Sequence, residues 1–140
     1  MAPRPSSFVA DTDIFIDYLN GIERMRMVLD SPRNRVYYSA VTRKELLAKP
    51  GLSSTERHRI QMLLLKHRLI PVDQRIADRF SLLLNKYARH GLRNADALIA
   101  ATAWSRKLRL LTRNTKHYRS ISEITLIDPS PPLAPTGNPA

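Results

Sequence analysis

Short apolar runs alternate with longer amphipathic stretches along most of the chain, and this alternation limits the possible folds more than any other feature. The apolar runs predict brief strands at residues 8–10, 35–41, 69–72, 108–112 and 124–127. The stretches between them have apolar residues at helical spacing and predict helices at residues 14–19, 42–48, 54–68, 74–90 and 95–107. Strands and helices that take turns predict an α/β fold, in which helices cover both faces of a parallel sheet.

The length of the chain fits a single folded domain. A chain of 140 residues can bury one core and is short for two domains. We expect this domain to span residues 8–127. The tail, residues 128–140, contains five of the ten prolines and is expected to be flexible, as is the short segment of residues 1–7.

The charge balance predicts a polyanionic partner. The chain has 23 lysines and arginines against 12 aspartates and glutamates, which gives a formal net charge of +11. This surplus favours nucleic acid or an acidic protein as the partner. A membrane partner is not expected, because the basic residues are spread along the chain and form no single amphipathic helix.

Other features of the composition exclude several classes of protein. The absence of cysteine excludes a disulfide framework and a cysteine zinc site. The sequence has no apolar run of 18 residues and no signal-peptide core. We therefore expect a soluble cytoplasmic protein.

Three aspartates interrupt the basic pattern directly after the first predicted strand. Asp11, Asp13 and Asp17 lie in a segment without lysine or arginine. One interpretation is that Asp11 caps the following helix and that Asp13 lies favourably at the positive end of the helix dipole. The other is that these two carboxylates, at the end of a strand, bind a divalent cation, which prefers oxygen ligands. Asp17, one helical turn later, is expected to be a solvated surface residue.

Two further acids lie near the starts of later helices. Glu45 follows the second predicted strand, and an ion pair with Lys49 at i+4 is the ordinary alternative to a functional role. Asp96 is the only acid between residues 79 and 122, a stretch with ten lysines and arginines. Its ordinary role is to answer the helix dipole behind an Asn94 cap. An isolated acid in such a basic stretch instead suggests a cation site that faces a polyanionic substrate.

The last candidate segment is "LTRNTKHY", residues 111–118. Thr112 is expected to end a strand, with Asn114 just beyond it and His117 further on. The ordinary role of Asn114 is that of a turn residue, and the ordinary place of His117 is the surface.

Taken in order, the segments "ADTDIFIDYL", "SAVTRKELL", "ADALIAATA" and "LTRNTKHY" resemble the PIN-domain family, and in particular its VapC-like ribonuclease toxins. The resemblance implies a three-layer α/β/α sandwich with a central parallel sheet. It also implies an acidic pocket that binds one or two Mg²⁺ or Mn²⁺ ions. By motif position, the catalytic metal ligands are Asp11, Glu45 and Asp96.

The same resemblance gives supporting or water-mediated roles at the metal to Asp13, Thr112 and Asn114. Members of the family often have a further acid in the last segment. This chain has Asn114 and His117 at the candidate positions, which leaves the binding of a second ion open.

The function implied is that of a metal-dependent endoribonuclease, the toxin of a toxin–antitoxin pair. Hydrolysis of a phosphodiester needs an activated water and neutralised charge, both of which carboxylate-bound Mg²⁺ supplies. Arg93, Arg113 and Lys116 lie nearest the proposed site in sequence and are candidates for contacts with RNA phosphates.

Members of this family are expected to bind a small antitoxin protein that covers the pocket, and to form homodimers. Apolar positions in residues 60–65 and 80–84 are candidates for such partner surfaces, and ordinary core is the alternative.

Two other functions are compatible with the residues. In haloacid-dehalogenase phosphatases, the first aspartate of a similar motif is a nucleophile, but Ile14 and Phe15 stand here where that family has a Gly-Thr turn. The second alternative is a non-catalytic RNA-binding module of the PIN fold, whose metal ligands are incomplete.

Overall fold

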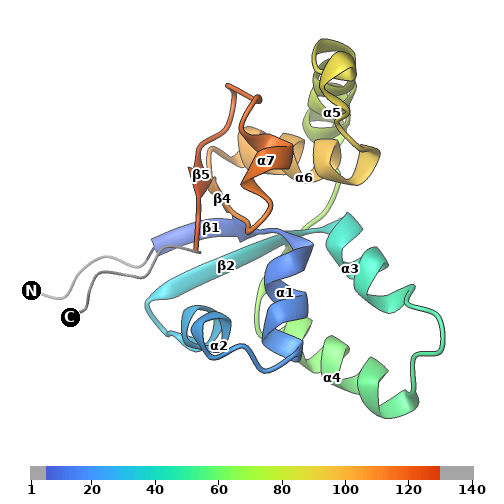
Figure 1. Ribbon diagram of the computed structural model, residues 1–140, viewed down its shortest axis with the longest axis vertical. Helices are drawn as coiled ribbons and strands as arrows, with labels where there is room; N and C mark the ends of the chain where they lie inside the picture. The colour runs from blue at the N-terminus through green and yellow to red at the C-terminus, as the bar shows by residue number, and fades with distance from the viewer. Residues whose placement is uncertain (1–5, 130–140) are drawn as a thin grey trace, which may run out of the picture.

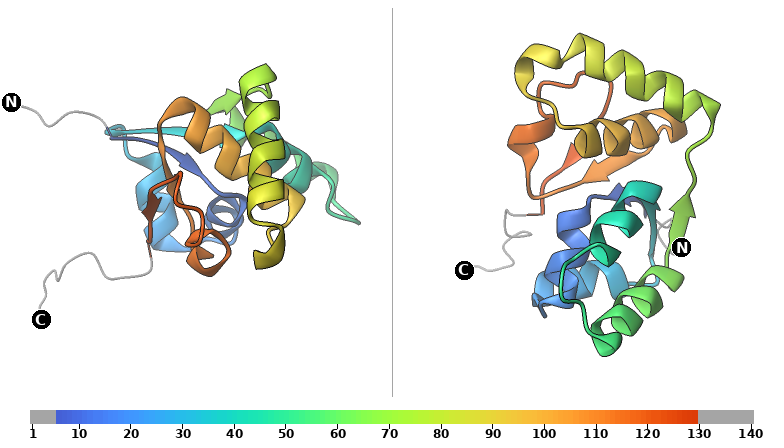
Figure 2. Two further views of the ribbon diagram at one scale, coloured as in Figure 1. Left: turned by 90° about the horizontal axis from the view of Figure 1, so that it is seen from above. Right: turned by 90° about the vertical axis from the view of Figure 1, so that its right-hand side faces the viewer.

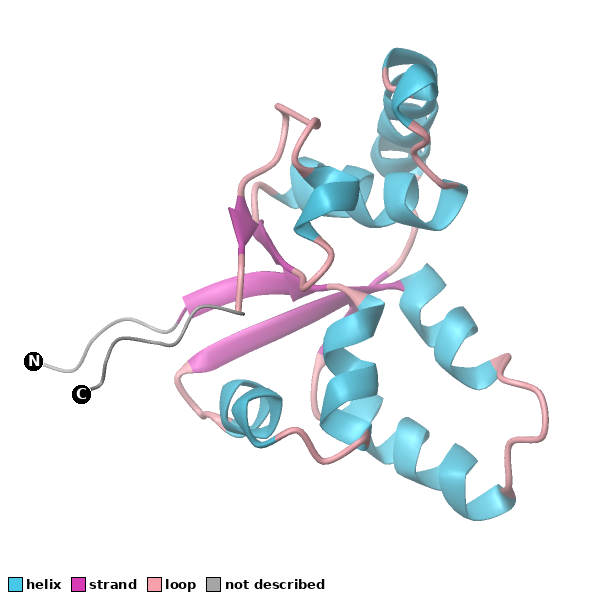
Figure 3. Cartoon of the chain, in the orientation of Figure 1, coloured by secondary structure: helices cyan, strands magenta, loops and turns pink. Residues whose placement is uncertain are grey.

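The chain folds around a five-stranded parallel sheet, which the computed structural model shows within the described residues 6–129 (Figures 1 and 3). The strands are β1 (Ser6–Ala10), β2 (Asn34–Ser39), β3 (Arg68–Ile70), β4 (Arg109–Leu111) and β5 (Leu126–Ile127). Their order is β3-β2-β1-β4-β5, and every neighbouring pair is parallel. Of the ends expected to be flexible, residues 1–5 and 130–140 lie outside the described residues. The prediction is wrong for Ser6 and Ser7, which belong to β1 because they pair with β2.

Helices cover both faces of this sheet, which confirms the predicted three-layer α/β/α fold (Figure 2). On one face lie α1 (Thr12–Leu19), α2 (Glu23–Asp30) and α4 (Ser54–Leu65), and on the other lie α5 (Gln74–Lys86), α6 (Asn94–Arg106) and α7 (Thr115–Tyr118). The helix α3 (Ala40–Leu47) contributes to both cores, with Leu46 in the first and Val41 against the second.

The strand order predicts where a ligand would bind, at the carboxyl ends of two central strands. From β1 the chain builds outward through β2 to β3, and then returns to place β4 and β5 on the opposite side. In open parallel sheets, ligands bind at the carboxyl ends of the strands where the order reverses. Here those strands are β1 and β4, and the residues that follow them are Asp11 and Thr112.

Several predicted elements end earlier than expected, and a local cause is clear for three of them. The predicted strand 35–41 stops at Ser39, whose side chain accepts a hydrogen bond from the backbone N–H of Val41 and begins α3. The predicted helix 54–68 ends at Leu65, because Arg68 already pairs with β2. The predicted helix 74–90 ends at Lys86 and is followed by a 3-10 turn, Ala88–His90, that closes on a left-handed glycine.

Two helices were not predicted from the sequence. In α2, the buried face formed by Met25 and Leu29 is interrupted by arginines, so its apolar spacing is weak. The helix α7 has only four residues, too few for any periodic signal.

The helix α6 positions Asp96 at the carboxyl edge of the sheet. Its alanines Ala97, Ala100, Ala101 and Ala103 are fully buried, and their small side chains allow close packing against α5 and the sheet. Asp96 lies in the first turn of this helix. No helix within residues 6–129 is long and apolar enough to cross a membrane.

Candidate active site

Asp11 lies at the carboxyl end of β1 and is only 4% exposed. The Thr12 backbone N–H donates to its Oδ1 at 2.8 Å, and the Thr112 hydroxyl donates to its Oδ2 at 2.8 Å. Asp11 therefore caps α1, as one interpretation of the sequence held, and also faces the end of β4. Burial is the main cause that raises the pKa of Asp11, and the charge of Asp96 raises it further.

Asp13 lies in the first turn of α1, beside Asp11. The backbone N–H of Arg113 donates to its Oδ2 at 3.1 Å, whereas its Oδ1 is buried without a hydrogen-bond partner. Burial, and then the charge of Asp11, raises the pKa of Asp13 to about 7. A buried carboxylate oxygen without a donor needs a compensating group, such as a water or a cation.

Asp96 has the most contacts of the predicted ligands. Arg93 binds it with two nitrogens, Nε to Oδ2 and Nη2 to Oδ1, each at 3.1 Å. The Tyr118 hydroxyl donates to Oδ1 at 3.2 Å, and His117 Nδ1 lies 3.5 Å from Oδ2. The predicted Asn94 cap is wrong by one residue, because α6 begins at Asn94 and its N-cap is Arg93.

Glu45 is an exposed residue of α3 that joins the site through two threonines. The Thr12 hydroxyl donates to Glu45 Oε1 at 2.7 Å, and it lies 2.9 Å from the Thr42 hydroxyl. Thr12 thus contacts Glu45 through its side chain and Asp11 through its backbone. The alternative ion pair of Glu45 with Lys49 is wrong, because Lys49 instead lies 3.8 Å from Glu56.

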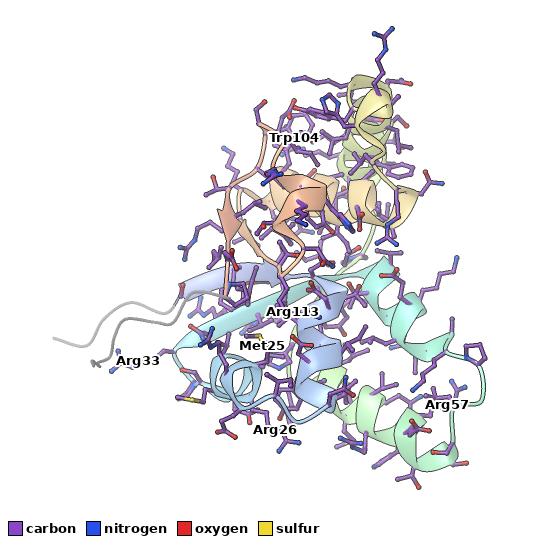
Figure 4. All side chains as sticks on the ribbon, in the orientation of Figure 1. Met25, Arg26, Arg33, Arg57, Trp104 and Arg113 are labelled. Atoms are coloured by element: carbon purple, nitrogen blue, oxygen red, sulfur yellow. The ribbon has the colours of Figure 1, made fainter. Side chains whose placement is uncertain are left out.

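The loop after β4 contains the remaining predicted residues, and Figure 4 shows Arg113 near the start of α1. The Arg113 Nε lies 2.5 Å from Asp17 Oδ2. Asp17 is therefore not a solvated surface residue: its side chain is 14% exposed and is paired with Arg113. Asn114 is the N-cap of α7, and its backbone N–H donates to the Thr112 hydroxyl at 3.0 Å, while Lys116 is exposed.

Three residues of this network were missed by the sequence analysis: Thr12, Thr42 and Tyr118. Tyr118 is fully buried, and burial, together with the charges of Asp11 and Asp96, raises the pKa of its hydroxyl, which therefore stays protonated. No spacing rule distinguishes these residues from ordinary helix residues. The position of the threonines just after strand ends is the only sequence signal that could have indicated them.

Thr12 links the predicted ligands Asp11 and Glu45, and the charge of Asp96 acts on Asp11, but the three acids do not form a finished metal-binding group. Within residues 6–129, no three acidic or histidine side chains are arranged to hold an ion. The chemistry of the donors nevertheless fits Mg²⁺ or Mn²⁺, because all are hard oxygens. Buried like charges and the orphaned Asp13 Oδ1 also create a site where a cation would be stabilised. The assignment of ligands stays a prediction.

Comparison with known proteins agrees with this geometry. Residues 8–122 match the PIN domain family. The chain is 31% identical to Ribonuclease VapC10 of Mycobacterium tuberculosis over 134 residues, which is 93% of this chain and 96% of that protein. A toxin-antitoxin complex from Klebsiella pneumoniae is similar at 30% identity with a TM-score of 0.70, over 87% of this chain and 97% of the other. VapBC-1 from nontypeable Haemophilus influenzae, at 23% identity and a TM-score of 0.74, covers 89% of this chain and 99% of its own, and supports the fold.

Proposed function

This chain belongs to the PIN-domain family, and we propose that it is a metal-dependent endoribonuclease that acts as the toxin of a toxin–antitoxin pair. The observation that carries this proposal is the group of buried acids at the reversal point of the sheet, in a chain of net charge +11. The relatives named as a ribonuclease and as toxin-antitoxin complexes support it. Family membership removes the phosphatase alternative. We assign the activity to residues 8–127.

Asp11, Glu45 and Asp96 are the carboxylates that we assign as ligands of Mg²⁺ or Mn²⁺, with one or two ions. A divalent ion held in this way supplies an activated water and neutralises charge on the phosphate and the leaving oxygen. Thr112 and the backbone of Thr12 fix the orientation of Asp11 through the two hydrogen bonds to its oxygens. Tyr118, a buried donor, holds one oxygen of Asp96. These contacts position the acids before substrate binds.

Supporting roles fall to residues around this centre. Asp13 has one buried oxygen without a partner, so it is suited to bind a water at the site. Asn114 supports the position of the Thr112 hydroxyl through its backbone N–H. The basic rim for RNA phosphates consists of Arg93, Arg113 and Lys116, and Lys116 is the most available of the three because the arginines are paired with acids.

The function is tested by cleavage of RNA in the presence and absence of divalent ions. We expect the purified protein to cut single-stranded RNA in Mg²⁺ or Mn²⁺, to stop in excess EDTA, and to recover when Mn²⁺ is added back. Gel electrophoresis of end-labelled RNA measures the products. Cleavage that continues unchanged in EDTA would rule out the metal-dependent reaction.

A non-catalytic RNA-binding module is the second candidate, because the predicted ligands do not form a finished metal-binding group within residues 6–129. That candidate predicts RNA binding that responds to salt, and no cleavage of any RNA with Mg²⁺ or Mn²⁺.

The antitoxin partner has a suitable groove next to the site. A groove of about 410 Å³ lies between α1, α3 and α4. Its lining is half apolar, with Ile16, Leu46 and Ile60 among those side chains, and half polar or charged, with Lys49 and Arg59 among those. Glu45 also lines it, so the groove borders the acidic site at this residue. We assign this groove to a segment of the antitoxin that leads toward the acids, and we expect a short reading frame directly upstream to encode that protein.

The stretches 60–65 and 80–84 are partly core and partly exposed. Ile60, Leu63, Leu64 and Leu83 are buried, which agrees with ordinary core. The exposed residues Met62, Leu65 and Leu82 remain candidates for a homodimer surface. We also assign the protein to the cytoplasm, because the proposed substrate is cellular RNA.

Replacing Ile16 with aspartate tests the groove. Ile16 is 43% exposed in the groove, so a charge there should weaken binding to the antitoxin by at least about tenfold without unfolding α1. Copurification of the co-expressed pair measures the effect. Met27→Asp, at a 66% exposed position of α2 outside the groove, is the matched control. Equal capture of both variants would show that the antitoxin binds elsewhere.

A further inference from the structure

The guanidinium of Arg93 holds Asp96, one of the acids of the proposed metal site. Arg93 is the N-cap residue of α6, but its side chain makes no capping hydrogen bond. It turns back to Asp96, three residues later, and holds both carboxylate oxygens at 3.1 Å. This two-pronged geometry is the strongest form of an arginine–carboxylate contact.

The charge of a second proposed ligand, Glu45, also acts on Arg93. The hydrogen bonds and charge of Asp96 are the main cause that raises the pKa of Arg93, and the charge of Glu45 raises it further. The direct contacts of the guanidinium are with Asp96, one of the three acids that we assign to the metal. It supplies a positive charge on that side of the site.

The two partners differ strongly in exposure. The Arg93 side chain is 64% exposed, whereas that of Asp96 is 6% exposed. Asp96 also keeps contacts with Tyr118 and His117 that do not depend on Arg93. Arg93 can thus leave into solvent while Asp96 stays in place.

We propose that Arg93 is a displaceable occupant of the metal site, and that it must release Asp96 before this carboxylate can bind a divalent ion. The inference rests on the proposed metal-dependent function. It accounts for the state of Asp96, whose two carboxylate oxygens both accept hydrogen bonds from Arg93. Once released, Arg93 remains at the rim of the site, where an RNA phosphate is the natural new partner for its guanidinium.

The test measures Mn²⁺ binding to the purified full chain by isothermal titration calorimetry, without RNA. Arg93→Gln removes both the positive charge and the two-nitrogen contact with Asp96. This variant should bind Mn²⁺ about three to ten times more tightly than wild type. Arg93→Lys keeps the charge but loses the two-nitrogen contact, so its affinity for Mn²⁺ should lie between those of wild type and Arg93→Gln. The matched control is Arg89→Gln, which removes the same charge from an exposed residue of the preceding 3-10 turn and should bind Mn²⁺ as wild type does.

Each outcome decides between distinct explanations. Thermal unfolding in EDTA shows whether the variants fold, and a purely structural role for Arg93 would lower the melting temperature without tightening Mn²⁺ binding. Unchanged or weaker binding in Arg93→Gln, or an Arg93→Lys variant identical to wild type, would overturn the displacement proposal alone if wild type still binds Mn²⁺ and cuts RNA. Failure of wild type and Arg93→Gln alike to bind Mn²⁺ would overturn both this proposal and the metal-dependent function.

Discussion

The Asp96→Asn variant is expected to lose RNA cleavage by at least about 100-fold and to keep its fold. Changes to residues that only support a metal ligand cost about 10 to 100-fold, and loss of a charged ligand should cost more. Stability should change by less than about 1 kcal/mol, because two effects oppose each other. The variant weakens the pair with Arg93, but it also removes a charge that is close to Asp11.

Expression in bacteria gives the measurement for this variant, because both growth and the 5′ ends of cellular RNA can be followed after induction. The control is Asp78→Asn. It removes one acid from an exposed position of α5 that is not part of the candidate active site. The control should arrest growth and produce new RNA ends as wild type does. Identical RNA ends and identical growth for wild type and Asp96→Asn would remove the nuclease assignment.

The fold could be predicted because its signals are local. Each strand is a brief apolar run, and each long helix has apolar residues at helical spacing, so the order of elements was readable along the chain. The element ends were less readable, since Ser39 converts the end of a strand into a helix cap through one hydrogen bond. Serine is a favoured N-cap residue, but its place inside an apolar run made the strand the stronger signal.

The acids of the site were predictable as unusual charges, but their partners were not. Asp11 and Asp96 stand out in a basic sequence, whereas Tyr118 and Thr12 look like ordinary helix residues. The Arg93–Asp96 contact joins the N-cap of α6 to a residue three positions later, a common spacing for ion pairs. The sequence does not show that the Tyr118 hydroxyl also binds Asp96. Nor does it show that the charges of Asp96 and Glu45 act on Asp11 and Arg93, respectively.

Stability of the metal-free protein is expected to fall as the pH rises from about 4 to about 7, and Asp13 is the residue that should dominate this change. The pKa of Asp13 is raised from its usual 3.8 to about 7 in the folded protein. Between these values the folded state binds more protons than the unfolded state, so rising pH favours unfolding. The full shift corresponds to an upper limit of about 4 kcal/mol.

Asp13→Asn should therefore be more stable than wild type by about 2 kcal/mol at pH 8 in EDTA, and of nearly equal stability at pH 4. The gain is below the upper limit, because the asparagine amide has no partner at the position of the orphaned Oδ1, although its carbonyl can still accept from the Arg113 N–H. Urea denaturation at several pH values measures the slope. Asp78→Asn removes an equal charge from an exposed position and should keep the wild-type slope. If the free energies of unfolding of Asp13→Asn and wild type change in parallel from pH 4 to pH 8, the buried charge of Asp13 beside Asp11 does not destabilise the metal-free protein. The electrostatic reason to expect a cation there would then be lost.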